Sequence, residues 1–289
     1  MRYFLLLAAA CLAFASDKPA YQFYSQKLKA VNYQKVLKEA NDADVVFFGE
    51  LHNNPICHWL ELQLTKDLYA EKKTQLLLGA EMFEADNQAA LSDYVAGKTS
   101  DKEFAKQARL WNNYKTDYRP LVDFARDNKI PMVATNVPRR YASTVARQGL
   151  AALDTLPTAQ KAWIAPLPLT VDLTLPGYKA MLDMMHGDNA KTAPEQGANF
   201  ARAQAIKDAT MAHFILQNRK PGTTFLHYNG SYHSNNFEGI IWYLRQKQPD
   251  LKIVTIASVE VPDTAKPDKA NENLASFILQ IPADMTKTY

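Results

Sequence analysis

The sequence predicts an α/β fold in which a largely parallel central sheet is flanked by helices. Short apolar runs alternate with amphipathic helical patterns along the 289-residue chain, which is the order of elements expected for a parallel sheet covered on both faces. The runs are apolar at successive positions rather than at alternate ones, as in strands buried on both faces. Several runs end in glycine or polar residues, which a parallel sheet delivers to one edge.

Six strands are expected from these apolar runs, at residues 44–48, 75–80, 130–134, 223–227, 251–257 and 276–281. The last strand is placed at a sheet edge, because Pro282 follows it and cannot donate a hydrogen bond to a neighbour. Helical patterns occupy the intervals, at residues 33–40, 88–96, 101–110, 121–128, 198–217 and 237–246. Together these ranges give the alternation that the fold class requires.

A further helix is expected directly after the first strand. Asn54 is a good N-cap residue, and Pro55 suits the first helical position because its missing N–H would be unpaired there. The apolar stripe of this helix consists of Cys57, Leu60, Leu64 and Leu68. Cys57 is therefore interpreted as a buried small hydrophobe rather than as a nucleophile.

One long stretch departs from the alternation of strand and helix. Residues 141–219 contain no strand candidate, and we interpret them as a helical insertion between the third and fourth strands. The loop at residues 166–176, rich in Pro, Leu and Asp, could flank a site. No change in composition marks a boundary, so residues 16–289 are predicted to form a single domain.

Residues 1–15 have the pattern of a signal peptide. Arg2 supplies the positive start, and Ala13-Phe14-Ala15 suits cleavage by a signal peptidase. The apolar run between them is too short to span a bilayer, which needs about 20 apolar residues. The protein is therefore expected to be exported, to the periplasm or the outer membrane. Cys11 follows three alanines and resembles a lipoprotein cleavage site, so a lipid anchor at Cys11 is the alternative.

The charge of the chain does not point to nucleic acid as a partner. Its formal net charge is +3, and the basic residues are scattered rather than gathered in a stripe. The sequence also lacks the pattern of an acidic tail or of a membrane-surface segment. The charge pattern therefore does not indicate a function, and particular side chains are more informative.

Polar side chains follow the first four predicted strands, at the edge where an α/β sheet binds its ligands. They are Glu50, His52, Glu81, Asn136 and His233. Carboxylates and imidazoles at one edge can hold a divalent metal and activate water. They can equally act without a metal, as a general acid and base. The spacing does not match a compact metal motif and does not choose between these two chemistries.

Each of these residues also has a purely structural interpretation. Glu50 would stabilise the N-terminus of the helix that follows it. Glu81 would pair with Arg139 or Arg140. The polar cluster would then be a network that orients the insertion.

Two further histidines are given ordinary roles. His58 is expected to be a solvated residue in the first turn of its helix. His227 lies inside the fourth strand and is expected to be a core histidine with its hydrogen bonds satisfied. Neither is expected to bind a ligand.

Six blocks of sequence, in order, resemble the ChaN-like haem-binding uptake family. They lie at residues 45–58, 79–83, 118–125, 136–139, 203–212 and 230–233. The first contains Phe48-Gly49-Glu50-Leu51-His52, the second contains Gly79-Ala80-Glu81, and the last is Gly230-Ser231-Tyr232-His233. The matches run from about residue 44 to 245, and the ordered set is a specific signal.

The resemblance implies a fold shared with the Tiki proteases and the erythromycin esterases. It also implies haem binding by a homodimer that holds two stacked haems, in iron acquisition at the bacterial cell envelope. An outer-membrane haem receptor is the candidate partner. The family uses a tyrosine as axial ligand, with basic side chains near the propionates, and phenolate ligation of ferric haem is chemically sound.

The resemblance directs the search for haem contacts to the insertion as well as to the strand ends. The candidate haem-binding residues are Tyr178, Lys179, His186, His52, Asn136 and Arg139. Tyr178 is the candidate ligand of the haem iron, and His186 is the alternative ligand. A helix whose Met and Leu side chains pack in a core is the other interpretation of residues 176–186.

Two functions are weighed on these grounds. The first is a haem-binding protein of the cell envelope that takes part in haem or iron uptake without turnover. The alternative is a hydrolase, with or without a divalent metal, in which Glu50, Glu81 and His233 are catalytic.

Overall fold

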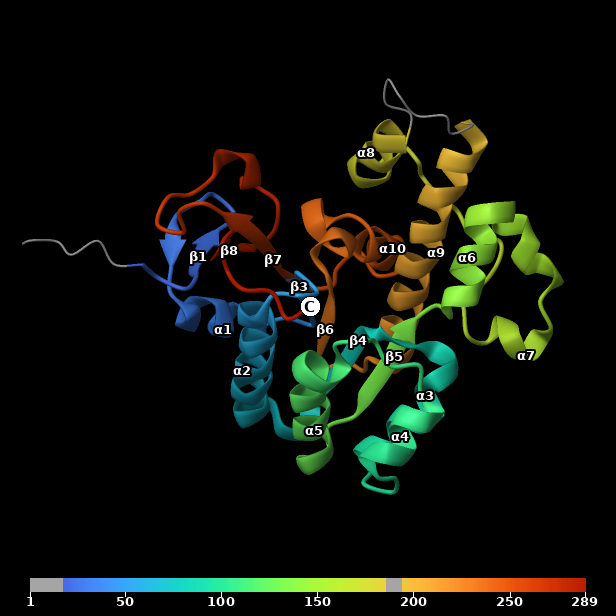
Figure 1. Cartoon of the computed structure of the whole chain (residues 1–289), viewed down its shortest axis with the longest axis horizontal. Helices are drawn as coiled ribbons and strands as arrows, with labels where there is room; N and C mark the ends of the chain where they lie inside the picture. The colour runs from blue at the N-terminus through green and yellow to red at the C-terminus, as the bar shows by residue number, and fades with distance from the viewer. Residues whose placement is uncertain (1–17, 186–193) are drawn as a thin grey trace, which may run out of the picture.

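A computed structural model of the protein describes residues 18–185 and 194–289. Its centre is an eight-stranded sheet with the order β2-β1-β8-β7-β3-β6-β4-β5 (Figure 1). The strands are β1 Gln22–Ser25, β2 Ala30–Val31, β3 Val45–Glu50, β4 Leu76–Glu84, β5 Met132–Asn136, β6 Thr224–Gly230, β7 Ile253–Val261 and β8 Phe277–Pro282. The strands from β8 to β5 pair in parallel, whereas β1 pairs antiparallel to β8 and to β2. The predicted fold class is confirmed.

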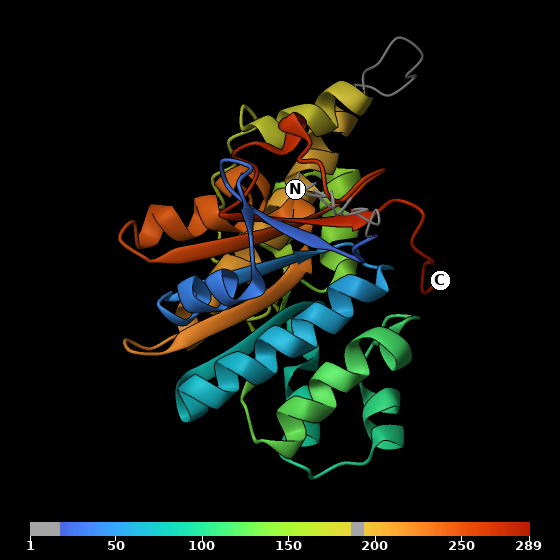
Figure 2. The same ribbon diagram turned by 90° about the vertical axis from the view of Figure 1, so that its left-hand side faces the viewer.

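Helices cover both faces of the sheet, with α2 and α5 on one side and α10 on the other (Figure 2). They are α1 Tyr33–Asn41, α2 Pro55–Lys72, α3 Gln88–Val95, α4 Asp101–Gln107, α5 Arg119–Asp127, α6 Arg139–Gln148, α7 Thr158–Lys161, α8 Pro176–Met185, α9 Pro194–Asn218 and α10 Ile240–Lys247. As predicted, Asn54 caps α2, because its side-chain oxygen accepts from the N–H groups of Ile56 and Cys57.

The central strand β3 is buried on both faces, which explains its uninterrupted apolar sequence. Phe48 packs with Leu60 of α2 in the larger apolar cluster. Phe47 points to the opposite face and packs with Met211 of α9. Both phenylalanines are at most 1% exposed. Helices on both faces therefore bury successive side chains of the strand, as in other parallel sheets.

Strand β8 is an internal strand, so the expectation that it lies at an edge is wrong. Residues 277–280 of β8 pair with β1, and the β1–β2 hairpin forms the edge instead. Pro282 lies beyond this paired stretch, so its missing N–H removes no hydrogen bond to β1. The hairpin escaped prediction because β1 and β2 contain only four and two residues.

The described part of residues 141–219 contains helices and no strand, as predicted. Helices α6, α8 and α9 pack around two small apolar clusters of their own. Figure 1 shows these helices, with α7, gathered on one side of the strands. Because α9 also packs against β5 and α10, this helical region is tied to the sheet.

Three of the predicted features lie outside the described residues. They are the signal peptide at 1–15, the lipid anchor at Cys11 and the candidate ligand His186. All three stay predictions. Across residues 18–185 and 194–289, no helix is long and apolar enough to cross a membrane.

Gly49 allows three strands to meet closely at the edge where the polar residues gather. A Cβ atom at this position would lie 2.7 Å from the carbonyl oxygen of Ile256 and 2.9 Å from Cα of Ser231. Both neighbours are backbone atoms that cannot move away cheaply. Glycine therefore lets β7 and the turn after β6 approach β3 just before Glu50.

Candidate functional site

The polar residues predicted to follow the strands lie at or near the carboxyl ends of four neighbouring strands. Glu50 is the last residue of β3 and Asn136 is the last residue of β5. His233 lies in the short turn directly after β6. Glu81 differs from the prediction because it lies inside β4, which continues past an irregularity in its pairing with β5.

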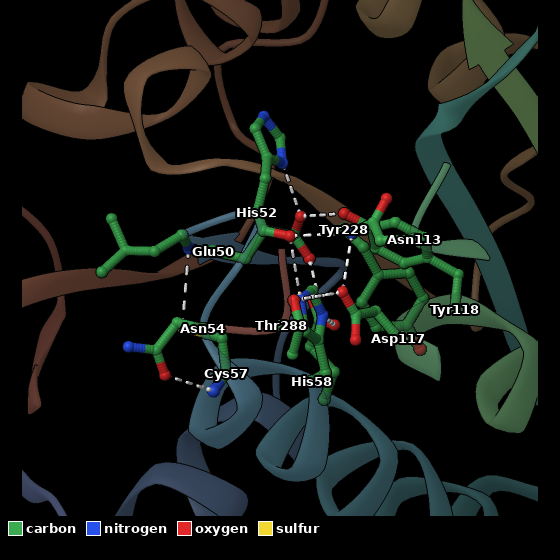
Figure 3. Close-up of polar contacts among 12 residues, drawn as sticks. Glu50, His52, Asn54, Cys57, His58, Asn113, Asp117, Tyr118, Tyr228 and Thr288 are labelled. Carbon is green, nitrogen blue, oxygen red and sulfur yellow. Dashed lines mark hydrogen bonds and ion pairs between the residues drawn. The ribbon is translucent and has the colours of Figure 1, made fainter. Parts of the chain in front are cut away.

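Glu50 accepts two short hydrogen bonds at the same oxygen, Oε1 (Figure 3). The Tyr118 hydroxyl and His52 Nδ1 each lie 2.6 Å from it. Burial raises the pKa of Glu50, but the hydrogen bond from His52 and the nearby charge of His58 outweigh burial and hold the pKa well below its ordinary value. Glu50 is therefore a carboxylate at neutral pH, although it is only 1% exposed.

The second nitrogen of His52, Nε2, is left free by this arrangement. Within the described chain it has no hydrogen-bond partner, and a Cβ atom at Gly230 would lie 2.8 Å from it. The side chain of His52 is 35% exposed. Burial lowers the pKa of His52, but the hydrogen bond to Glu50 and the charge of Glu81 reverse this and raise it. His52 is thus an oriented imidazole with one nitrogen open to a ligand.

His58 is buried rather than solvated, so the expectation for this residue is wrong. The first turn of α2 lies beneath the end of β3, which leaves His58 7% exposed. Its Nδ1 lies 3.2 Å from Glu61 Oε2, and its Nε2 lies 3.1 Å from the His52 carbonyl oxygen. Burial lowers the pKa of His58, but its contacts with Glu50 and Glu61 raise it to about 11.

Asp117 lies on the other side of His58 and connects it to the end of the chain. Its Oδ2 accepts hydrogen bonds of 2.7 Å from Asn113 Nδ2 and from the Thr288 hydroxyl. The same oxygen lies 3.5 Å from His58 Nε2. Figure 3 shows these side chains converging from different parts of the chain.

A second polar chain joins Glu81, His233 and Asp208. Glu81 Oε2 accepts a 2.8 Å hydrogen bond from the Gly230 N–H, and its Oε1 lies 3.3 Å from His233 Nε2. His233 Nδ1 lies 2.6 Å from Asp208 Oδ1. Burial lowers the pKa of His233, but the two carboxylates outweigh it and raise the pKa to about 10. Burial raises the pKa of Glu81, but His233 lowers it to about 2.

These pKa values make Glu81 and His233 a charged ion pair at neutral pH. A general base acts best when its pKa lies near the working pH. The pKa of the His233 imidazolium is too high for that role, because the side chain lies between two carboxylates. Its ion pairs instead hold the turn after β6 in place. The structural pairing of Glu81 with Arg139 or Arg140 does not form, since Arg140 pairs with Asp86 at 2.6 Å.

Tyr178 and Lys179 lie in α8, and Tyr178 joins the polar chain of Glu81 and His233 through Asp208. Tyr178 is 3% exposed, and its hydroxyl donates a 2.6 Å hydrogen bond to Asp208 Oδ2. Burial and the charge of Asp208 raise its pKa well above the ordinary value, which opposes a phenolate. Tyr178 lines a pocket of about 330 Å³ together with Leu175 and Pro176 from the end of the predicted loop. Lys179 is exposed and pairs with Asp183 at 2.8 Å.

A larger cleft of about 1180 Å³ opens over the strand ends. It exceeds the roughly 300–1,000 Å³ usual for small-molecule sites. Five of the predicted site residues line it, namely His52, Glu81, Asn136, Arg139 and His233. Apolar and aromatic side chains from several elements add to the lining, among them Leu110, Trp111, Val137, Met181, Phe200 and Tyr232.

The basic side chains of the cleft fall into two groups. Arg109 and Arg140 both pair with Asp86 at the rim. Arg139 and Lys207 have no ion pair within the described ranges. The charge of Lys207 does contribute to the low pKa of Glu81. The cleft therefore presents two cations that an anionic ligand could engage.

Residues 36–244 match the family described as haem-binding uptake, Tiki superfamily, ChaN. The chain belongs to this family. The predicted match at about 44–245 coincides with this range, and the recognition made from the sequence is confirmed.

One solved structure supports the assignment at the level of the fold. A structure described as cofacial heme binding to ChaN of Campylobacter jejuni is similar to this member, with a TM-score of 0.69 and 17% identity over 90% of this chain and 96% of that one. An erythromycin esterase mutant, EreC, in its open conformation reaches a TM-score of 0.48 at 11% identity, covering 82% of this chain and 77% of that one.

A curated relative comes from a plant. RETICULATA-RELATED 5, a chloroplastic protein of Arabidopsis thaliana, is 23% identical over 192 residues, which is 64% of this chain. The ChaN-family chain spans about a quarter of that relative's length, since the match covers 26% of it.

Two other sequence predictions are confirmed beside the site. Cys57 is fully buried, and burial raises the pKa of its thiol to about 12. His227 is fully buried between the Thr135 hydroxyl at 2.8 Å and the Asn229 side-chain oxygen at 3.0 Å. Both therefore belong to the core rather than to the site.

Several residues of the site were not found from the sequence. Asp208 is one of many polar residues in the 25-residue helix α9, although the block at 203–212 that carries the family resemblance contains it. Glu61 stands one helical turn after His58, and that spacing was the available signal. Trp111 and Phe200 come from a loop and from the insertion, which no local pattern brings together.

Proposed function

We propose that this ChaN-family protein binds haem in the large cleft and takes part in haem or iron uptake at the bacterial cell envelope. One observation carries the proposal. The cleft combines apolar and aromatic walls, cations without a carboxylate partner, and an imidazole oriented by a carboxylate. Haem presents the complementary chemistry, because it has a flat apolar ring, two propionates and an iron that takes axial ligands.

The walls of the cleft suit the porphyrin ring. Trp111, Met181 and Phe200 line it from a loop, from α8 and from α9. Phe200 is 39% exposed, so part of its ring is open to solvent at the cleft. Covering such side chains with a flat apolar ring would remove them from water and favour binding.

Arg139 and Lys207 are the side chains proposed to hold the propionates. Both line the cleft and neither is engaged by a carboxylate in the described parts of the chain. A guanidinium can bind a carboxylate through two parallel hydrogen bonds, which adds orientation as well as attraction. Arg109 and Arg140 are less suited because each already pairs with Asp86.

His52 is the residue whose geometry best suits an axial ligand. Histidine ligands of metals usually direct their second ring nitrogen to a carboxylate, and His52 Nδ1 lies 2.6 Å from Glu50 Oε1. Tyr178 stays the candidate that the family resemblance suggests. To ligate iron as a phenolate, Tyr178 would have to break its hydrogen bond to Asp208. It would also have to lose its proton, although burial and the charge of Asp208 raise its pKa.

The proposal extends to assembly and location on the strength of the family. A homodimer around two stacked haems, a haem receptor in the outer membrane as partner, and export directed by residues 1–15 all follow from the sequence resemblance or pattern. A lipid anchor at Cys11 is the alternative form of attachment. Mass spectrometry of the mature protein expressed in a bacterial host would distinguish a free N-terminus near residue 16 from a lipidated Cys11.

The proposal is tested by titrating the purified protein with haemin. We expect a Soret band that saturates at a fixed stoichiometry, with size-exclusion chromatography reporting any dimer formed on binding. His52→Ala should shift the band, and Lys179→Ala should leave it unchanged because Lys179 lies outside the cleft. A titration that fails to saturate would contradict the proposal.

A hydrolase is the second candidate, and one observation favours it. His52 Nε2 and Glu81 Oε2 both approach Gly230, so an imidazole and a carboxylate meet at the floor of an open cleft. The pKa of about 10 for His233 opposes its assigned catalytic role at neutral pH. A panel of ester and peptide substrates, with and without divalent metals, tests this alternative. Turnover that disappears in Glu81→Gln would support it.

A further inference from the structure

A buried cluster lies between β3 and α2, outside the cleft, and we name it the β3–α2 cluster. It consists of Glu50, His58 and Glu61, which are 1%, 7% and 1% exposed. One ligand atom from each lies within 4.8 Å of the other two. None of the three lines the cleft. The cluster is therefore separate from the proposed haem site, although Glu50 also contacts His52.

The cluster contains more acidic than basic groups. Asp117 adjoins it, so three buried carboxyl groups face the two imidazoles of His52 and His58. Among the described residues, no lysine or arginine pairs with any of these carboxyl groups. Buried charges are costly unless they are paired or coordinate a cation. The excess of acid requires either a bound cation or a shared proton.

Two carboxylate oxygens in the cluster have no hydrogen-bond partner. They are Glu50 Oε2 and Glu61 Oε1, both buried. The other oxygen of Glu50 is already engaged by Tyr118 and His52. Orphaned acceptors of this kind are rare in folded proteins, because each forfeits its hydration without replacement. Their presence indicates that a further group is needed inside the cluster.

His58 has the orientation of a metal ligand. Its Nε2 lies 3.1 Å from the His52 carbonyl oxygen, which accepts a hydrogen bond and fixes the ring. Its Nδ1 then faces Glu61 Oε2 at 3.2 Å and Glu50 Oε2 at 3.4 Å. Ligands placed tetrahedrally at about 2.1 Å from zinc are about 3.4 Å from one another. Both distances from His58 Nδ1 to the carboxylate oxygens are close to that spacing.

We propose that Glu50, His58 and Glu61 bind one divalent transition-metal ion in the interior of the protein. One imidazole and two carboxylates suit zinc, manganese or ferrous iron better than the all-oxygen sites of calcium and magnesium. All three ligands are buried, so the ion is structural. It joins the first turns of α2 to the end of β3 and holds the Glu50 carboxylate against His52.

The test uses zinc and cobalt with haem-free protein, so that haem iron does not enter the measurement. The protein is unfolded in a denaturant that contains a chelator, which removes any bound metal. It is then refolded with or without Zn²⁺, desalted and analysed for metal. We expect one zinc per chain and a rise in Tm of more than about 5 °C relative to the chelated protein. Co²⁺ in place of zinc should give the visible absorption bands of an ordered site.

Variants locate the ion. Glu61→Gln and His58→Gln should lose the stoichiometric zinc, whereas Glu81→Gln and His233→Gln, which alter the strand-end pair instead, should retain it. If the cluster variants fail to fold, as judged by circular dichroism, the zinc content, Tm shift and cobalt spectrum of the wild-type protein still decide the question. Zinc below one equivalent in the wild type, or zinc lost in Glu81→Gln and kept in Glu61→Gln, would overturn the proposal. Haemin binding is measured separately, so either proposal can fail alone.

Discussion

His52 Nδ1 lies 2.6 Å from Glu50 Oε1, and this contact connects the end of β3 to the cleft above it. The carboxylate fixes the imidazole ring and leaves Nε2 on the side of the cleft. The Tyr118 hydroxyl, also 2.6 Å from Oε1, holds the carboxylate in turn. A buried acid thereby orients a half-exposed base.

Glu50→Gln tests this orientation. The amide keeps the shape of the carboxylate but removes its charge, so His52 loses its anionic partner. Substitution of such a partner typically lowers metal affinity by roughly 10–100-fold, and we expect a similar loss in haemin affinity. Tyr118→Phe should cost less, because it leaves the charge in place. Equal affinities for Glu50→Gln and the wild type in a Soret titration would show that Glu50 does not act through His52.

The His233 imidazolium predicts a specific dependence of stability on pH. Its pKa is about 10 in the folded protein and about 6.5 in an unfolded chain. A raised pKa contributes stability that is fully present below pH 6.5 and is lost as the pH rises through 10. The free energy of unfolding should therefore fall over that window, by an amount on the order of a few kcal/mol. Urea denaturation at several pH values measures it.

Asp208→Asn serves as the control for that dependence. It removes one of the two carboxylates that hold the proton on His233. The fall in stability between pH 6.5 and 10 should become shallower in this variant. The same slope in both proteins would mean that another group is responsible for the pH dependence.

Arg139 is expected to act through a charge on the ligand. Arg139→Ala should weaken haemin binding by roughly 1.5 kcal/mol, or about tenfold, because a charged hydrogen bond to a propionate is lost. The deficit should shrink at high salt, since exposed charges are screened. Isothermal titration at two ionic strengths checks both statements. Lys179→Ala, the matched surface cation, should match the wild type at either salt concentration.

Gly230→Ala is expected to displace His52. The added Cβ would lie 2.8 Å from His52 Nε2, which is closer than such atoms approach in proteins. Haemin affinity should fall in the single variant, and His52→Ala should already remove most of that affinity. In the double variant the two losses should therefore not add. Additive losses would indicate that Gly230 matters for some other reason.

The fold could be predicted because its signals are local. The runs within β3, β4, β5, β6 and β7 are mainly apolar at successive positions, which is the pattern of strands covered on both faces. β1 and β2 carried no comparable signal, because two very short strands at an edge have few buried positions. Pro282 then led to the wrong position for β8.

The site could be predicted only in part, for a related reason. Parallel strands bring Glu50, Asn136 and His233 to one edge of the sheet whatever the details of packing. The grouping of these residues could therefore be predicted from the sequence. His58 was misread because its burial depends on how the first turn of α2 lies under β3. Tyr178 was chosen because the family resemblance implies a tyrosine ligand, yet its partner Asp208 lies 30 residues away along the chain. Contacts between distant segments leave no periodic pattern.

The central claim is that haem occupies the cleft over the strand ends, and filling that cleft tests it most directly. Ser143 lines the cleft from α6, whereas its neighbour Thr144 does not. Equilibrium haemin titrations would compare Ser143→Trp with Thr144→Trp, after both are shown to be folded. The account predicts that Ser143→Trp loses saturable binding and that Thr144→Trp binds like the wild type. Full binding by a folded Ser143→Trp variant would contradict it.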